Sequence, residues 1–307
     1  MNIFDTRTKY LNNQLSKPDY IKQMYQFHHS KLFEYAEFIK QTNISSIEII
    51  DEKVIVTSRD QVKMICPKGD HRVAPIESLN FLDYETMESA MIMRLLEPAD
   101  CVVDIGANMG WYSINIAKKY PDSKIYAFEP IPKTYHYLAE NISLNNIQNI
   151  EACPFGLSNE KNDLAFYFYP EGGVNASIAN VSEREDVELI NCHVEKLDDF
   201  VEQKKIKIDF IKCDVEGAEL FAFKGGVESI KRDKPIVFTE MLRKWSAKFN
   251  YHPNEIILMF SDLGYECFYC SEDKLVKINT MTDDTVETNF FFLHSDKHAL
   301  QISNLKS

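Results

Sequence analysis

The sequence predicts an α/β fold in which helices cover both faces of a mostly parallel sheet, preceded by a smaller helix and strand extension. Three observations support this prediction. From Asp100 onward, short apolar segments alternate with helical ones, which is the order that builds a parallel sheet. A glycine-containing turn joins the first of these strands to a helix, and an acidic residue ends the second. Apolar residues make up 45% of the 307 residues, enough for a sizeable core.

Residues 1–83 are expected to form the extension. Apolar side chains recur at roughly helical spacing over 18–41, which predicts an amphipathic helix. The runs within 46–66 are typical of strands, with a turn near Asp51. The extension would serve as a cap, a substrate-binding element or a dimerisation element, and the apolar stripe of 18–41 favours a homodimer through this region.

The connection to the main domain contains glycine, two prolines and polar residues over 67–83, which indicates a loop. A helix is expected from Tyr84 to about Glu97, because Pro98 cannot continue it. The segment from Arg72 to Glu77, continuing to Tyr84 and Glu85, is expected to fold over a bound cofactor as a lid.

The main domain follows as an ordered series of elements. Strands are predicted at 101–105, 124–128, 150–154, 208–213, 235–239, 265–270 and 288–294. Helices are predicted at 112–119, 133–144, from 214 to 230, and at 254–263. An inserted β element is expected within 164–181, and residues 296–307 are expected to be a frayed polar tail.

Charge and cysteine content limit the expected partners and compartment. The net charge is −13, from 34 basic and 47 acidic residues, so a nucleic acid is a poor partner. The seven cysteines include one C-x-x-C, Cys267–Cys270, without the second pair of a structural zinc site. Free thiols, an N-terminus without a signal-peptide core and the lack of a membrane-spanning run predict a soluble, cytoplasmic protein.

The first chemical signal is the turn Gly106-Ala107-Asn108-Met109-Gly110, which follows the strand carrying Asp104. Glycines allow a ligand to approach the backbone closely. The helix that follows offers free N–H groups and a positive dipole end, which suit an anionic group such as a carboxylate. We therefore expect this turn to hold one end of a cofactor.

The second signal is Glu129, at the end of the second strand and just before Pro130. It lies 25 residues after Asp104, where an acid can accept hydrogen bonds from both hydroxyls of a ribose. A nucleoside cofactor is the expected ligand. The alternative is a plain strand-to-helix turn with a buried, hydrogen-bonded Asp104.

The sequence of the turn also distinguishes between two possible nucleoside cofactors. The G-x-G-x-x-G pattern that accommodates a pyrophosphate needs one more glycine than this turn has. Asp104 would repel a pyrophosphate, whereas it suits the ammonium of a methionine moiety. The pattern favours S-adenosylmethionine over a nicotinamide dinucleotide.

Three motifs together resemble the FkbM family of methyltransferases: 102–113 with its glycine turn, Ala127-Phe-Glu-Pro130, and Asp209-Phe-Ile-Lys-Cys-Asp-Val-Glu-Gly-Ala-Glu219. The last is the most specific of the three. The resemblance covers about 84–294 and implies a Rossmann-like class I methyltransferase domain over 84–295, with a mostly parallel seven-stranded sheet. It also implies methyl transfer to a hydroxyl of a sugar, glycolipid or polyketide. Cys213 departs from the family pattern at a position that should be buried.

Acidic residues follow the later strands of the predicted sheet. Asp214 and Glu216 come after one buried strand, Glu240 ends the next, and Asn289 opens the last. Ligands bind beyond the carboxyl ends of parallel strands, and an antiparallel last strand would bring Asn289 to the same edge. A carboxylate can take the proton of an acceptor hydroxyl. We expect Asp214 or Glu216 to be this base and Glu240 to orient the acceptor.

Two alternatives remain open for these acids. Asp214, Glu216, Glu240 and Asn289 offer oxygen ligands of the kind that Mg²⁺ or Ca²⁺ prefers, although a metal is not favoured. Alternatively, Glu216 and Glu219 are acids that satisfy a helix N-terminus, which is the expectation for Glu219.

Other positions are expected to contact ligands from the rim of the site. Phe155 follows the third strand and would border the adenine, whereas Asn175 and Ser177 in the insert would contact the acceptor or simply form a solvated hairpin tip. His193 is expected to be structural. The expected cofactor-binding set is Asp104, Gly106, Ala107, Asn108, Gly110, Glu129, Pro130 and Phe155.

The leading hypothesis is therefore a methyltransferase that modifies a small-molecule or glycan hydroxyl. Methylation of nitrogen or of a carboxylate is the nearest alternative, and an amine would need less help from a base. A nicotinamide oxidoreductase and a catalytically inactive binding module are the alternatives from other classes.

Overall fold

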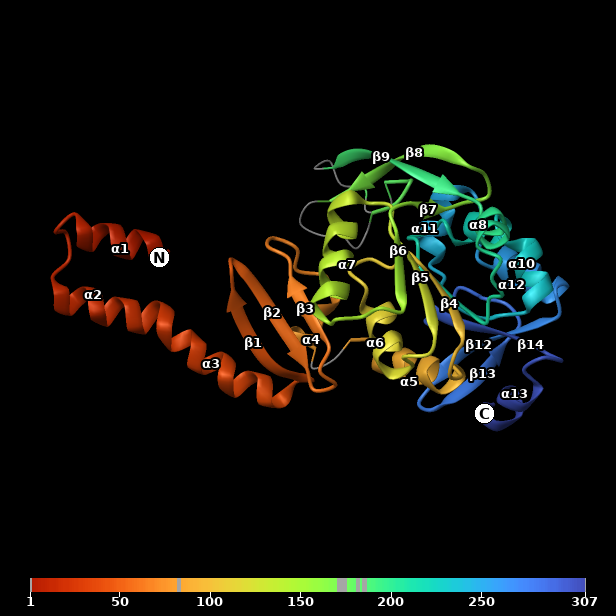
Figure 1. Ribbon diagram of the computed structural model, residues 1–307, viewed down its shortest axis with the longest axis horizontal. Helices are drawn as coiled ribbons and strands as arrows, with labels where there is room; N and C mark the ends of the chain where they lie inside the picture. The colour runs from red at the N-terminus through yellow and green to blue at the C-terminus, as the bar shows by residue number, and fades with distance from the viewer. Residues whose placement is uncertain (1, 82–83, 170–175, 181–182, 184–186, 307) are drawn as a thin grey trace.

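The computed structural model describes the whole chain except residues 1, 82–83, 170–175, 181–182, 184–186 and 307 (Figure 1). Its centre is an eight-stranded sheet with the order β13-β12-β14-β11-β10-β4-β5-β6. The strands are β4 (Cys101–Ile105), β5 (Lys124–Phe128), β6 (Ile150–Cys153), β10 (Phe210–Cys213), β11 (Ile236–Glu240), β12 (Tyr265–Ser271), β13 (Lys274–Ile278) and β14 (Asn289–His294).

Five neighbouring strands of this sheet, from β11 to β6, pair in parallel. The last strand, β14, pairs antiparallel with β11, and Asn289 lies opposite Glu240, as expected. The mostly parallel, Rossmann-like α/β fold is confirmed. The sheet has eight strands where seven were expected, because β13 pairs back onto β12 as a hairpin.

Helices cover both faces of the sheet, and successive strand residues face opposite sides. Val102 packs in one core with residues of α5 (Thr86–Leu95) and α6 (Trp111–Lys119). Val103 packs in the other with residues of four helices, namely α8 (Leu197–Lys204), α9 (Glu219–Lys224), α10 (Val227–Asp233) and α12 (Asn254–Asp262). A short helix, α11 (Arg243–Ser246), follows β11.

The N-terminal extension consists of a helical part and a small antiparallel sheet, β1-β2-β3. The helical part is α1 (Ile3–Leu11), α2 (Lys17–Met24), a π-helical stretch (Tyr25–His29), α3 (Ser30–Phe38) and a 3-10 turn (Ile39–Gln41). The strands are β1 (Ile44–Ile50), β2 (Lys53–Ser58) and β3 (Lys63–Cys66). Figure 1 shows α1 and α2 projecting away from the rest of the molecule.

The small sheet is held to the main domain by α7 (Pro132–Leu144) and the residue after it. The Asn141 and Asn145 side-chain oxygens accept hydrogen bonds from the backbone N–H groups of Ile65 and Lys63, each at 2.9 Å. These side chains satisfy backbone groups on an edge of the small sheet that has no neighbouring strand.

Other parts of the chain also differ from the sequence prediction. The single helix expected from 214 to 230 is divided into α9 and α10, with Gly225 and Gly226 between them. The segment 67–83 was expected to be a loop, but it contains α4 (Ala74–Asn80), because Pro75 occupies the first turn, where proline is favoured. The tail 296–307 was expected to be frayed. It contains α13 (Ala299–Leu305), because Leu305 is buried against the core.

The insert after β6 forms a second three-stranded sheet, with the order β7-β9-β8. Its strands are β7 (Gly156–Leu157), β8 (Asn162–Phe168) and β9 (Glu188–Glu195). All seven cysteines are free. Among the described residues, no helix has the length and apolar character needed to cross a bilayer.

Candidate functional site

The turn between β4 and α6 brings two backbones close together. Gly106 has a φ of +76°, and a Cβ atom there would lie 1.9 Å from the backbone oxygen of Asp214. Gly110, at a φ of +91°, precedes α6, and a Cβ there would lie 2.6 Å from Leu138. Only glycine fits both positions, since each combines left-handed backbone with close packing.

A cavity of about 260 Å³ opens at this edge of the sheet. Eight residues expected in the site line it: Gly106, Ala107, Asn108, Glu129, Pro130, Asp214, Glu216 and Glu240. The expected lid segment also contributes, through Arg72, Ala74, Glu77, Tyr84 and Glu85. The structure therefore brings together residues from β4, β5, β10, β11 and the N-terminal extension.

Glu129 is held by the backbone on both sides. Its two carboxylate oxygens accept hydrogen bonds from Asn108 N–H at 3.0 Å and from Ile131 N–H at 2.9 Å. Burial raises the pKa of Glu129 to about 7, although these hydrogen bonds oppose the rise. Each oxygen keeps acceptor capacity, so the fixed carboxylate can accept the hydroxyls of a diol.

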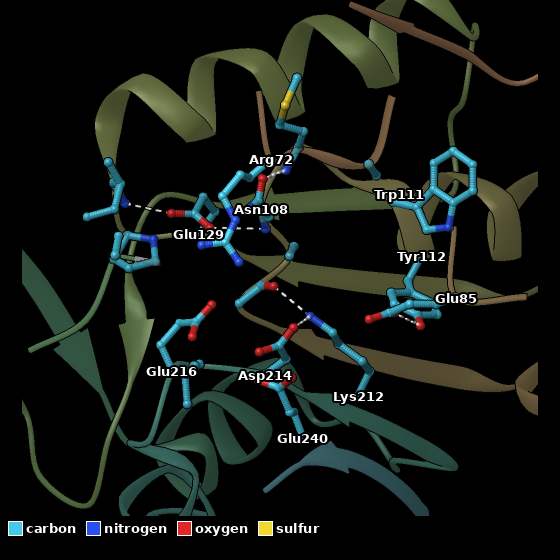
Figure 2. A pocket seen from close by; sticks show the side chains of 18 of the residues that line it. Arg72, Glu85, Asn108, Trp111, Tyr112, Glu129, Lys212, Asp214, Glu216 and Glu240 are labelled. Carbon is cyan, nitrogen blue, oxygen red and sulfur yellow. Dashed lines mark hydrogen bonds and ion pairs between the residues drawn. The ribbon is translucent and has the colours of Figure 1, made fainter. Parts of the chain in front are cut away.

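Beneath the cavity, Lys212 lies in β10 with only 3% of its surface exposed. Its ammonium donates to the carbonyl of Gly106 at 2.7 Å and lies 3.4 Å from Asp104 and 3.7 Å from Asp214. Burial alone would lower the pKa of Lys212, but the two aspartates outweigh it and hold that pKa above its ordinary value. Lys212 thus ties the glycine turn to the loop after β10 (Figure 2).

Asp104 does not line the cavity. It is buried, accepts a hydrogen bond from the Ser113 hydroxyl at 2.6 Å, and faces Lys212. The expected ammonium partner is thus present within the protein, because Lys212 lies directly opposite Asp104 on the neighbouring strand. A direct contact between Asp104 and a cofactor ammonium stays a prediction.

Glu216 is the most unusual acid in the site. Its backbone has a left-handed φ of +57°, which is uncommon for a side chain larger than that of glycine. The side chain is buried, and its Oε2 atom has no hydrogen-bond partner. Burial, together with Asp214 and Glu240, raises the pKa of Glu216 well above its ordinary value.

The backbone around Glu216 is fixed on several sides. Ser177 Oγ donates to the Glu216 carbonyl at 2.9 Å. Glu219 accepts hydrogen bonds from the N–H groups of Val215 and Gly217 at 3.1 and 3.0 Å, and Tyr251 donates to the Gly217 carbonyl at 2.9 Å. Glu219 is thus structural, as expected, and the Glu216 carboxylate is held at the cavity.

Other acids share this environment. Burial is the main cause that raises the pKa of Glu240 well above its ordinary value and that of Glu85 to about 7. Glu85 accepts a hydrogen bond from the Tyr112 hydroxyl and has a left-handed φ of +44°. In Figure 2, Asp214, Glu216 and Glu240 lie on one side of the cavity and Glu129 on the other.

Several expected site residues lie elsewhere. Phe155 packs against Phe128 and Phe200 rather than lining the cavity. Gly110, Ser177 and Asn289 are also absent from its wall, and Asn175 lies outside the described residues. The His193 ring contacts Asp163 and Glu195 on the insert. The ligand-binding roles expected of Phe155, Gly110, Ser177 and Asn289 stay predictions.

Within the described part of the chain, no three His, Cys, Asp or Glu side chains are arranged to hold a metal ion. Lys212 and Tyr112 also line the cavity, and neither was predicted from the sequence as a site residue. A signal for Lys212 was present, because a lysine inside an apolar strand must find a buried partner.

Comparisons with known proteins find methyltransferases among the relatives of this chain. Residues 104–267, more than half of the chain, match the model of the methyltransferase FkbM domain. Methyltransferase 1 of Beauveria bassiana is 31% identical over 142 residues, which cover 40% of this chain and 57% of that protein. Hexuronic acid methyltransferase AglP of Haloferax volcanii is 28% identical over 148 residues, covering 47% and 58%.

Among solved structures, methyltransferase FkbM of Methylobacillus flagellatus aligns over 86% of this chain and 59% of that one, with 15% identity and a TM-score of 0.40. The chain spans somewhat less than two thirds of the length of the curated methyltransferases named above. The family model matches from Asp104 to Cys267, so it includes the glycine turn, Glu129 and the acids after β10 and β11. The chain therefore belongs to the FkbM family of methyltransferases.

Proposed function

We propose that the protein is an S-adenosylmethionine-dependent methyltransferase whose acceptor is a hydroxyl of a sugar, glycolipid or polyketide-like molecule. The observation that carries the proposal is the Glu216 carboxylate, which is buried, held in a left-handed conformation and left without a partner at Oε2. Backbone strain and an unpaired buried polar group both lower the stability of the folded protein. They are typical of a site where the missing partner is a ligand.

The cofactor half of the cavity fits a nucleoside joined to an amino acid. Glu129 presents a fixed carboxylate for the ribose hydroxyls. Gly106 lets a ligand approach the backbone at the start of α6, where free N–H groups favour a carboxylate. When bound, S-adenosylmethionine would supply an activated methyl group on a sulfonium, so the protein needs to align it rather than activate it.

The acid cluster fits an acceptor that must lose a proton. Glu216 would accept that proton, and Glu240 would orient the acceptor. Like charges nearby favour the protonated forms of these acids, whereas a cation in the cavity favours their ionised forms. The cluster thus opposes an acceptor that carries a carboxylate, because like charges repel.

Among the relatives, AglP is named as a hexuronic acid methyltransferase, which supports a sugar acceptor here. Because the acid cluster opposes a carboxylate, it favours a neutral sugar that is methylated at a hydroxyl. Methylation of an amine is the second candidate, since the same acids would attract its cationic form. That form must lose a proton before its lone pair can attack, but it loses the proton more readily than a hydroxyl does. An amine needs less base assistance, so substitution of Glu216 distinguishes the two.

Calorimetric titration of S-adenosylhomocysteine tests the cofactor first, with NAD as a control ligand and Glu129→Ala as the control variant. We expect saturable binding to the wild type that is lost or much weakened in Glu129→Ala. Binding of NAD instead would overturn the assignment. Methyl transfer to a panel of sugars and polyketides, with Glu216→Gln beside the wild type, then tests the acceptor.

A further inference from the structure

The helical arm of residues 2–41 is the most unusual surface of the molecule. Large apolar side chains cover it: Ile3, Phe4, Leu11, Ile21, Tyr25, Phe27, Leu32, Phe33, Tyr35 and Phe38 are all exposed, Phe4 at 70% and Phe33 at 64%. Soluble monomers rarely expose an apolar patch of this extent. The patch lies on ordered helices, with Tyr10 stacked on Tyr20 and Thr6 contacting His28.

An apolar groove of about 920 Å³ begins at the root of this arm. One wall is formed by Leu32 and Tyr35 of α3 and by Ile39 of the following 3-10 turn, and the other by the small sheet together with α4 and α7. Leu32 and Tyr35 belong both to the exposed patch and to the groove wall. The arm and the groove therefore form one continuous apolar surface.

The arm cannot fill the groove of its own chain. The helical turns run without a break from Lys17 to Gln41, a rod about 35 Å long. They hold α1 and the start of α2 away from the small sheet β1-β2-β3, as Figure 1 shows, and this sheet lines the groove. A protruding apolar element and an apolar hollow on one chain can instead be satisfied reciprocally by two copies.

We propose that the protein forms a two-fold symmetric dimer in which the arm of each copy packs into the groove of the other. The area is sufficient. At about 200 Å² for each aromatic side chain, the six exposed Phe and Tyr residues of the arm present roughly 700 Å². A stable interface buries about 800 Å² on each partner, and the four exposed aliphatic residues of the arm supply the remainder.

Charge also favours a second copy as the occupant. The first 41 residues carry six basic and four acidic side chains, whereas the whole chain has a net charge of −13. A slightly basic arm is thus attracted to the acidic body of another copy. The groove rim carries both signs, through Glu52, Lys53, Lys68 and Glu140, which suits an arm with mixed charges.

Light scattering after size-exclusion chromatography, at about 1–100 µM protein, tests the proposal. The wild type is expected at twice the chain mass of 35.6 kDa. Phe27→Glu/Phe33→Glu should run at the monomer mass, and Ile49→Glu, on the groove wall, should weaken association at least tenfold. Leu258→Glu is the matched control, because Leu258 is 62% exposed on α12, and it should remain dimeric.

Circular dichroism and S-adenosylhomocysteine binding of the arm variant distinguish loss of pairing from loss of folding. If the wild type is a monomer at 100 µM, or if both interface variants remain dimeric, the proposal is wrong. A monomer that sediments with phosphatidylcholine–phosphatidylglycerol vesicles would assign the arm to a membrane surface instead. That outcome would also overturn the dimer.

Discussion

Two turns at the same edge of the sheet, one after β4 and one after β10, use left-handed backbone in different ways. After β4, Gly106 and Gly110 have left-handed φ angles of +76° and +91° at positions where added side chains would clash with neighbours, and Asn108 between them has a φ of +49°. After β10, Gly217 has a φ of +95°, and Glu216, whose side chain lines the cavity, has a φ of +57°. Glycine there would avoid the strain, which costs roughly 1–2 kcal/mol. In the first turn the backbone is the functional element, and in the second it is the side chain.

The surroundings of the two turns match this difference. The Gly106 carbonyl is bound by Lys212, which holds the first turn against the second. The second turn is fixed through its backbone by Ser177, Glu219 and Tyr251, while the Glu216 carboxylate has an oxygen without a partner.

The largest effect is expected for Gly106→Ala. The new Cβ would lie 1.9 Å from the Asp214 backbone oxygen, so the two turns must separate. We expect a loss of about 4 kcal/mol or more in the free energy of unfolding and no measurable binding of S-adenosylhomocysteine. Gly69→Ala is the control, because Gly69 has a φ of +90° but no atom within 4 Å of its Cβ position. A well-folded Gly106→Ala protein with normal binding would show that the turn after β4 does not require glycine at this position.

Glu216→Gln should remove activity but not cofactor binding. If Glu216 accepts the acceptor proton, kcat should fall by about 10²- to 10⁴-fold, while the Kd of S-adenosylhomocysteine changes little. Burial raises the pKa of Glu216 well above its ordinary value of 4.5, so the wild type loses stability as pH rises above that value, whereas a glutamine does not titrate. We therefore expect the free energy of unfolding of the variant at pH 8 to exceed that of the wild type by about 0.5–2 kcal/mol, and the difference should shrink toward pH 5. Near-normal kcat would favour the amine acceptor or remove Glu216 from the chemistry.

Glu129→Gln should weaken S-adenosylhomocysteine binding by about 10- to 100-fold, because two charge-assisted hydrogen bonds become neutral ones. In the wild type the pKa of Glu129 is about 7, so affinity should fall as pH drops from 8 to 6. The variant should show no such fall. Stability changes with pH in the opposite direction to affinity. Because the pKa of Glu129 is higher in the folded protein than in the unfolded chain, the free energy of unfolding should fall as pH rises from 4.5 through about 7. Titration calorimetry and thermal melts across this range measure both effects.

The smallest effect is expected for Ser177→Ala. Its hydroxyl is a positioning group that donates to the Glu216 carbonyl at 2.9 Å, so its loss should cost about 1 kcal/mol of stability. We expect kcat to fall roughly tenfold or less, with KM unchanged. Ser177→Thr should restore part of the loss. A rise in KM alone would indicate that Ser177 contacts the acceptor directly.

Much of the fold and part of the site were predictable from local pattern. The order of strands and helices after Asp100 follows from hydrophobic periodicity, and the β4 turn and Glu129 follow from residue types at strand ends. The helix α4 and the terminal α13 were missed. Pro75 was read as a loop signal although it opens a helix, and Leu305 is stabilised by a distant core.

By itself, the sequence determined the α/β order, the glycines and the acids that end the parallel strands, because each depends on periodicity and on residues close together in the chain. Only the tertiary structure decided that Asp104 pairs with Lys212. It also brought Glu85 and Tyr112 to the same cavity and packed the partly buried Phe155 against the core. These outcomes depend on strand register and on which buried charges neutralise one another, and both are set by contacts between segments far apart in the sequence.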